Sequence, residues 1–86
     1  MKYTLQILPS ASTAIAALPQ KLRVRIDERI RRLADEPRPS GFKKLKGTDT
    51  ALYRVRQGNH RLVYTIEDGV LLVIVVAVSD RKGSYR

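Results

Sequence analysis

The chain has 86 residues, which suits one domain spanning residues 1–86 and leaves no room for a second. Seventeen Lys and Arg residues against eight Asp and Glu residues give a net charge of +9, which indicates an anionic partner such as nucleic acid. The absence of cysteine excludes disulfides and thiolate metal sites, and the single His60 cannot form a metal cluster alone. We therefore expect no metal and no cofactor of the chain's own.

The N-terminal sequence predicts a cytoplasmic protein. Met1-Lys2-Tyr3-Thr4 leads directly into an alternating strand pattern, without the charged and apolar segments of a secretory signal. The longest apolar run, residues 70–78, has about half the length that a membrane helix needs. We expect no membrane partner.

The first part of the chain predicts a strand followed by two helices. Residues 2–8 alternate between polar and apolar, as in a half-buried strand. Residues 11–18 form a short helical stretch, and Pro19 suits the first turn of a second helix that runs to about Glu36. An apolar stripe at helical spacing is formed by Leu18, Leu22, Ile26, Ile30 and Leu33.

The rest of the chain predicts a basic loop at residues 40–47 and then three strands. The strands are expected at residues 51–57, 60–67 and 70–79. Gly58-Asn59 and Asp68-Gly69 suit two-residue hairpin turns between them, and the last strand is apolar enough for a central position. The predicted fold class is α+β, in the order β-α-α-β-β-β, with an antiparallel sheet packed by an N-terminal helical hairpin.

The turn at residues 58–59 predicts which side chains share a face of the sheet. It pairs Arg56 with Arg61 and places Arg54 on the same face. The opposite, core-facing set is Tyr53, Val55, Leu62 and Tyr64. Like charges directly opposite each other destabilise a sheet by up to about 1 kcal/mol. Because guanidinium groups bind phosphate well, this arrangement favours a polyanion site over two arginines that splay into water.

The segment after the last strand adds candidate groups. Arg81 and Tyr85 follow closely, and a turn at residues 68–69 would pair Arg61 with Val76, which brings this segment beside the other turn. Strict alternation sends Arg81 to the core face, so the strand must end or bulge first for Arg81 to join the cluster. The other possibility is a solvated terminus.

Several motifs, in this order and spacing, resemble the RelE/ParE superfamily of toxins from type II toxin–antitoxin systems. They are Pro37 to Gly47, Tyr53-Arg54-Val55-Arg56, Gly58 to Tyr64, and Asp80-Arg81 followed by Tyr85. The match covers essentially the whole chain. It implies a compact microbial-RNase-like fold and a cognate antitoxin that wraps the protein and blocks or displaces parts of its site.

The resemblance also implies a reaction. RelE-type members cut messenger RNA in the ribosomal A site without a metal, by attack of a 2′-hydroxyl on the adjacent phosphate. Arg61 matches the family's phosphate-stabilising arginine, Arg81 the arginine near the leaving group, and Tyr85 a tyrosine that orients the reacting nucleotide. Arg54 and Arg56 occupy the positions of catalytic lysines. The lysines expected to bind RNA are Lys43, Lys44, Lys46 and Lys82.

The general base is left open between two residues. Arginine stays protonated above about pH 12 and cannot easily replace a lysine as a base. Tyr85 could serve if nearby guanidinium groups lower its pKa from about 10. His60 has a suitable intrinsic pKa, but its place at a turn, on the core-facing side, favours a surface hydrogen-bonding role.

The aromatic residues near these arginines have two possible roles, core packing or base stacking. Core packing is expected for Tyr53 and Tyr64. Phe42 is either a loop anchor or an RNA contact. The helix arginines are expected to form a mostly solvated face that could also contact ribosomal RNA. Val24, off the apolar stripe, is a candidate contact for the antitoxin.

Two other functions fit the same residues. ParE-type members share the fold and inhibit DNA gyrase by protein binding, but they generally lack the full set of residues after the last strand, so Arg81 and Tyr85 favour the RelE type. A non-catalytic RNA-binding domain would use the arginines without cutting.

Overall fold

The computed structural model describes residues 2–45 and 51–80. It contains β1 (Thr4–Ile7), α1 (Pro9–Ala16), α2 (Gln20–Asp35), β2 (Lys43–Leu45), β3 (Leu52–Gln57), β4 (His60–Glu67), the 3₁₀ turn η1 (Asp68–Val70) and β5 (Leu72–Asp80). The α+β class is confirmed. No helix in these two ranges is long and apolar enough to cross a membrane.

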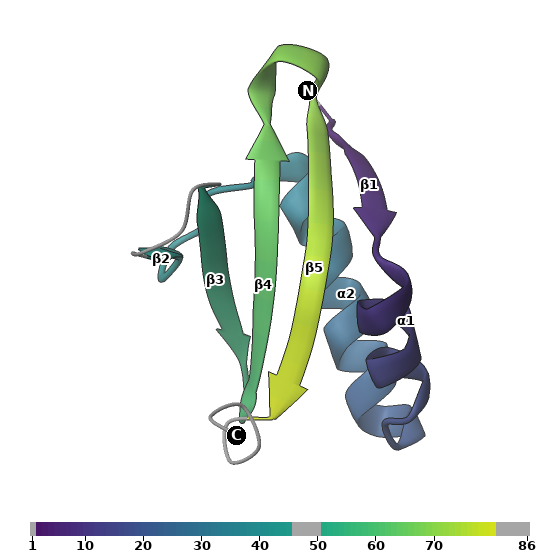
Figure 1. Cartoon of the computed structure of the whole chain (residues 1–86). Helices are drawn as coiled ribbons and strands as arrows, with labels where there is room; N and C mark the ends of the chain where they lie inside the picture. Colours follow the sequence, from purple (N-terminus) through teal and green to yellow (C-terminus); the bar gives the residue numbers. More distant parts are fainter. Residues whose placement is uncertain (1, 46–50, 81–86) are drawn as a thin grey trace.

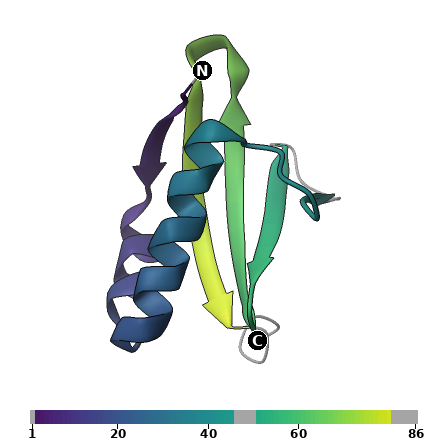
Figure 2. The same cartoon turned by 180° about the vertical axis from the view of Figure 1, so that it is seen from behind.

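The five strands form one sheet in the order β1-β5-β4-β3-β2, and both helices cover one face of it (Figures 1 and 2). β5 is an interior strand, between β1 and β4, although the middle strand of the sheet is β4. The sheet is mixed, however, because β1 runs parallel to β5 while the other neighbouring pairs are antiparallel. An entirely antiparallel sheet was therefore the wrong expectation at this edge. The chain passes through both helices and three strands between β1 and β5, so no hairpin dictates their relative direction.

The predicted basic loop contains a strand. Residues Lys43–Leu45 form β2, which pairs with β3 so that Lys43 faces Arg54. A three-residue strand is too short for its periodicity to be recognised in the sequence. Short, lysine-bearing strands are typical of sheet edges, where charge discourages further pairing.

The two helices differ slightly from their predicted bounds. Pro9 begins α1 as its first residue instead of preceding it, and Pro19 lies just before α2 as its N-terminal flanking residue. A proline suits the first helical turn because the amide that it lacks has no partner there. The middle of the predicted stripe forms the core, since Ile26, Ile30 and Leu33 are at most 2% exposed.

The predicted register of the hairpin between β3 and β4 is confirmed. Arg56 faces Arg61, and Val55 faces Leu62. Val55, Leu62 and Tyr64 are fully buried against the helices. The face of β3 and β4 that bears the arginines is therefore the face that the helices leave open.

The hairpin between β4 and β5 differs from the prediction. Its connection is η1 followed by Leu71, which adopts a left-handed conformation with φ 52°. A β-bulge also interrupts the pairing after Val63, so Arg61 faces Ser79 and not Val76. The longer connection shifts the register by two residues, and the bulge by one more.

A polar network ties the β4–β5 connection to the helical layer. The Arg38 guanidinium donates to both carboxylate oxygens of Asp68, at 2.9 and 3.3 Å, and the Tyr3 hydroxyl donates to the same carboxylate at 2.7 Å. The Arg38 hydrogen bonds lower the pKa of Asp68, and the bond to Asp68 raises the pKa of Tyr3. In the interior, the Tyr64 hydroxyl donates to the Pro37 carbonyl at 2.6 Å.

Candidate nucleic-acid interface

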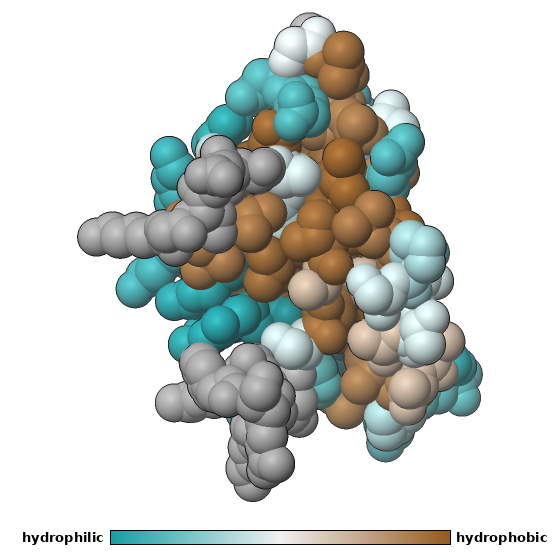
Figure 3. Space-filling view, viewed as in Figure 1, coloured by the Kyte–Doolittle hydropathy of each residue, from teal (hydrophilic) through white to brown (hydrophobic). Residues whose placement is uncertain are grey.

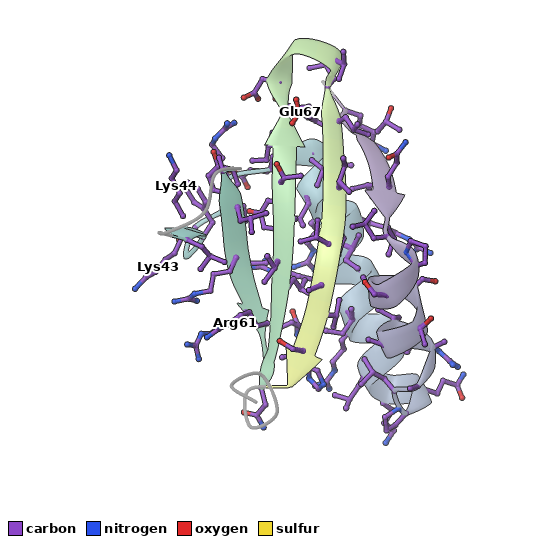
Figure 4. All side chains as sticks on the ribbon, viewed as in Figure 1. Lys43, Lys44, Arg61 and Glu67 are labelled. Carbon is purple, nitrogen blue, oxygen red and sulfur yellow. The ribbon has the colours of Figure 1, made fainter. Side chains whose placement is uncertain are left out.

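A row of cations crosses the open face of the sheet. We call it the basic strip, and it consists of Lys43, Arg54, Arg56 and Arg61. Lys43 faces Arg54, and Arg56 faces Arg61, so cross-strand pairing places all four on one face. Figure 4 shows Lys43 and Lys44 extending from β2 and Arg61 near the other end of β3.

The side chains of the basic strip differ in exposure. Lys43 and Arg56 are exposed, whereas Arg54 and Arg61 are half-buried. Lys44 is also exposed, but it faces Tyr53 and so has the opposite parity from the strip. The strip therefore combines two half-buried arginines with two cations in solvent, an arrangement that suits a chain of phosphates.

An apolar patch lies beside the basic strip on the same open face. It consists of Val63, Leu72, Ile74 and Ala77, all of them half-buried. Figure 3 shows this apolar surface over β4 and β5. Val63 joins the two regions, because it lies between Arg54 on β3 and Ala77 on β5. A contiguous apolar surface of this kind is typical of an interaction site.

The aromatic residues serve packing. Tyr64 is fully buried and Tyr53 packs against the core, as expected. Phe42 also packs against the core, with its ring 5.8 Å from that of Tyr53, which supports the loop-anchor interpretation. These rings lie behind the sheet face that carries the basic strip.

The predicted surface position of His60 is wrong. This residue is only 7% exposed, and it pairs with Asp80 at the end of β5. His60 does have the predicted core-facing parity, since it follows the opposite alternation from Arg61. Its ring is therefore directed away from the basic strip, which argues against His60 as the general base.

Four predicted site residues, Lys46, Arg81, Lys82 and Tyr85, lie outside the described residues, and their roles stay predictions. The structure does describe the strand that leads to Arg81. The bulge in β5 places Ala77 and Ser79 on the open face, opposite Val63 and Arg61. This is the change of parity that the proposed role of Arg81 requires. The uninterrupted apolar run in β5 gave no sign of it.

A second cation-lined site was not predicted. A pocket of about 210 Å³ lies on the helical side and is lined by Arg25, Glu28, Arg29, Arg32 and Gln57. The sequence shows the helical spacing of the three arginines, but not that α2 brings them to the end of β3.

Comparison with known proteins places the chain in a family. Residues 5–85 match the model of the ParE toxin of type II toxin–antitoxin systems. The toxin RelE of Mycobacterium tuberculosis is 31% identical over 85 residues, which cover 98% of this chain and 87% of the relative.

Solved structures agree with this assignment. A chain of the RelE–RelB complex of Pyrococcus horikoshii is 27% identical, with a TM-score of 0.83 over 98% of this chain and 100% of that one. A chain of the M. tuberculosis toxin–antitoxin complex RelBE2 is 26% identical, with a TM-score of 0.84 over 94% and 93% of the two chains. The protein belongs to the RelE/ParE superfamily of toxins from type II toxin–antitoxin systems.

Proposed function

We propose that this toxin is of the RelE type and cuts messenger RNA in the ribosomal A site without a metal. The observation that carries the proposal is the direct pairing of Arg56 with Arg61 on the open face, with Arg54 in the same basic strip. Two guanidinium groups in this relation are unfavourable for the sheet alone. A phosphate between them would turn the repulsion into binding.

The reaction needs a group that takes the 2′-proton, charge that stabilises the crowded phosphorane, and a proton for the leaving 5′-oxygen. In the proposal, Arg61 stabilises the phosphorane and Arg81 acts near the leaving group. Arg54 and Arg56 hold the neighbouring phosphates. Tyr85 orients the nucleotide and, as a phenolate, takes the 2′-proton, since nearby guanidinium groups would lower the pKa of a phenol. As the bond from phosphorus to the 5′-oxygen breaks, Tyr85 returns that proton to the leaving 5′-oxygen. The products are a 2′,3′-cyclic phosphate and a 5′-hydroxyl.

The proposed protein partner is a cognate antitoxin that covers the open face. One of the solved relatives is a RelE–RelB complex. The basic strip beside the apolar patch fits an amphipathic segment with acidic residues along one side. Such a segment would occupy the surface that RNA requires. Its complex should weaken as salt is added, because part of the attraction is between exposed charges. Since its substrate is on the ribosome, the toxin would act in the cytoplasm.

A second candidate function is inhibition of DNA gyrase by protein binding. It is favoured by the family model, which describes the ParE toxin. The basic strip would then face an acidic protein surface, and Arg81 and Tyr85 would have no chemical role. A gyrase supercoiling assay separates this function from RNA cutting.

The test is primer extension on messenger RNA from bacteria that briefly express the toxin. The wild type is compared with Arg81→Ala, Tyr85→Phe and a matched control, Arg31→Ala, which removes an exposed arginine of α2 outside the basic strip. We expect cuts that follow the reading frame, that fade in the first two variants and that persist in the control. Intact message with growth still arrested would contradict the proposal and favour gyrase.

A third arm separates cutting from mere RNA binding. The Tyr85→Phe variant should bind a short single-stranded RNA about as tightly as the wild type, since only a phenol is lost. A variant that loses RNA affinity and cleavage in parallel would indicate a binding residue instead of a chemical one.

A further inference from the structure

The pocket between α2 and the end of β3 is distinct from the basic strip. Arg25, Arg29 and Arg32 are spaced so that they share one side of α2. Gln57 closes the pocket from the last position of β3, where it faces His60 and follows the core-facing alternation. The pocket and the basic strip therefore lie on opposite faces of the sheet.

Arg29 is the unusual member of this pocket. Its Nε is buried and has no hydrogen-bond partner among the residues that the structure describes. None of the hydrogen bonds or ion pairs found between described residues involves its side chain. A buried donor without an acceptor is costly, and in native proteins such a donor normally finds a partner. A ligand bound in the pocket that Arg29 lines could supply this acceptor.

The charge of the pocket indicates which ligand. Three guanidinium groups line it against a single carboxylate, that of Glu28. Guanidinium groups donate in a planar fork that matches the oxygens of a phosphate, and the Gln57 amide offers a neutral donor. At about 210 Å³ the pocket is large enough to hold a phosphate group.

We propose that this pocket binds a backbone phosphate of folded RNA. The pocket and the basic strip are on opposite faces of the sheet, so a phosphate bound at one site does not contact the other. The two sites would thus hold two RNAs, the message on the open face and ribosomal RNA on the helical face. Naming the ribosome as the source of this phosphate rests on the proposed function, whereas the phosphate chemistry of the pocket does not.

The first experiment measures sedimentation of the full chain with purified ribosomes. Arg25→Gln and Arg29→Gln should each weaken binding by about tenfold, because each removes a charge-assisted contact. The matched control is Arg31→Gln, which removes the same charge from an exposed position of α2 outside the pocket. Glu28→Gln should have the opposite effect and tighten binding. Binding of a short single-stranded RNA should respond to the pocket variants no more than to the control.

Three outcomes would overturn the inference. One is equal ribosome binding by the pocket variants and the control, even if the wild type cuts message as proposed. Another is a loss of antitoxin binding with ribosome binding unchanged, which would make the pocket a site for an acidic peptide. The third is weaker binding by Glu28→Gln. Arg25 is exposed, so its variant remains informative even if Arg29→Gln fails to fold.

A second measurement does not depend on the ribosome. The NMR resonance of the Arg29 Nε–H group is followed while inorganic phosphate is added to the full chain. We expect a saturable shift that is smaller in the Arg25→Gln variant. Absence of a shift would refute the phosphate site. If the shift occurs but the protein cuts no message, the phosphate site stands and only the proposed function is refuted.

Discussion

Arg38 and Arg61 represent two uses of arginine at opposite ends of the same sheet. Arg38 is paired with Asp68, which also accepts a hydrogen bond from Tyr3. Arg61 has another arginine, Arg56, as its cross-strand neighbour. At the first end the chain supplies the matching anion for its own cation. At the second it places two like charges directly opposite each other, an arrangement that a bound phosphate would stabilise.

The largest expected effect is on catalysis. Arg61→Ala should lower the rate of message cutting by about 100-fold, as loss of a transition-state donor typically does. Arg38→Ala removes an arginine whose partner is internal, so it should leave the rate per folded molecule unchanged. Single-turnover cutting on ribosomes measures both. If both variants lost the same fraction of the cutting rate, the proposed difference in role between Arg38 and Arg61 would be contradicted.

The next largest effect is on stability, at the end of the sheet where Arg38 lies. Tyr64→Phe should lower the free energy of unfolding by about 1–3 kcal/mol, because the buried Pro37 carbonyl just before Arg38 loses its hydrogen bond. Burial raises the pKa of Tyr64 to about 12. Since the folded-state pKa is raised, the advantage of the wild type should be complete below pH 10 and decline between pH 10 and 12. Urea unfolding tests this, and a constant difference across that range would contradict it.

A smaller effect of opposite sign is expected in the basic strip. Arg56→Thr should raise the free energy of unfolding by a few tenths to about 1 kcal/mol, because it removes the like-charge neighbour of Arg61. The same variant should bind single-stranded RNA more weakly. Chemical denaturation and fluorescence anisotropy measure the two effects. If the variant is less stable than the wild type, the pair of Arg56 and Arg61 stabilises the fold. The proposed contrast with Arg38 and Asp68 would then be wrong.

The smallest effect concerns Asp68. Its pKa is lowered, mainly by the Arg38 hydrogen bonds, so its stabilising effect should be present above pH 4 and be lost as the pH falls through the lowered pKa. Asp68→Asn should therefore lower the melting temperature near pH 7 but not near pH 2. The Arg38 and Asp68 side chains are 43% and 56% exposed, so the shift should be small. A shift of equal size at both pH values would contradict an ionic origin.

The contrast between the two hairpins shows what the sequence could predict. Gly58-Asn59 forms the two-residue turn that it favours, so the pairing of Arg56 with Arg61 followed directly. Asp68-Gly69 is similar in sequence, yet the chain continues through η1 to Leu71 before β5 begins. Residues 72–78 are apolar throughout, and such a run carries no alternation that would reveal a bulge.

The candidate sites divide in the same way. The three arginines of the basic strip could be predicted because one local turn determines which side chains share a face. The alignment of Lys43 with them depends on β2, which was expected to be a loop. The pocket around Arg29 could not be predicted, because it depends on how α2 packs against β3, and the sequence spacing alone indicated a solvated helix face. His60 was misplaced because its position next to the turn was given more weight than its core-facing parity, whereas the structure leaves it only 7% exposed.

The central claim is best tested with purified toxin, ribosomes and a message with a defined codon in the A site. The account predicts a cut at that codon that leaves a 2′,3′-cyclic phosphate, that requires the ribosome and that falls about 100-fold with Arg61→Ala. The account would be contradicted if the purified toxin cut the message at no codon while expression of the same toxin in cells still arrested growth.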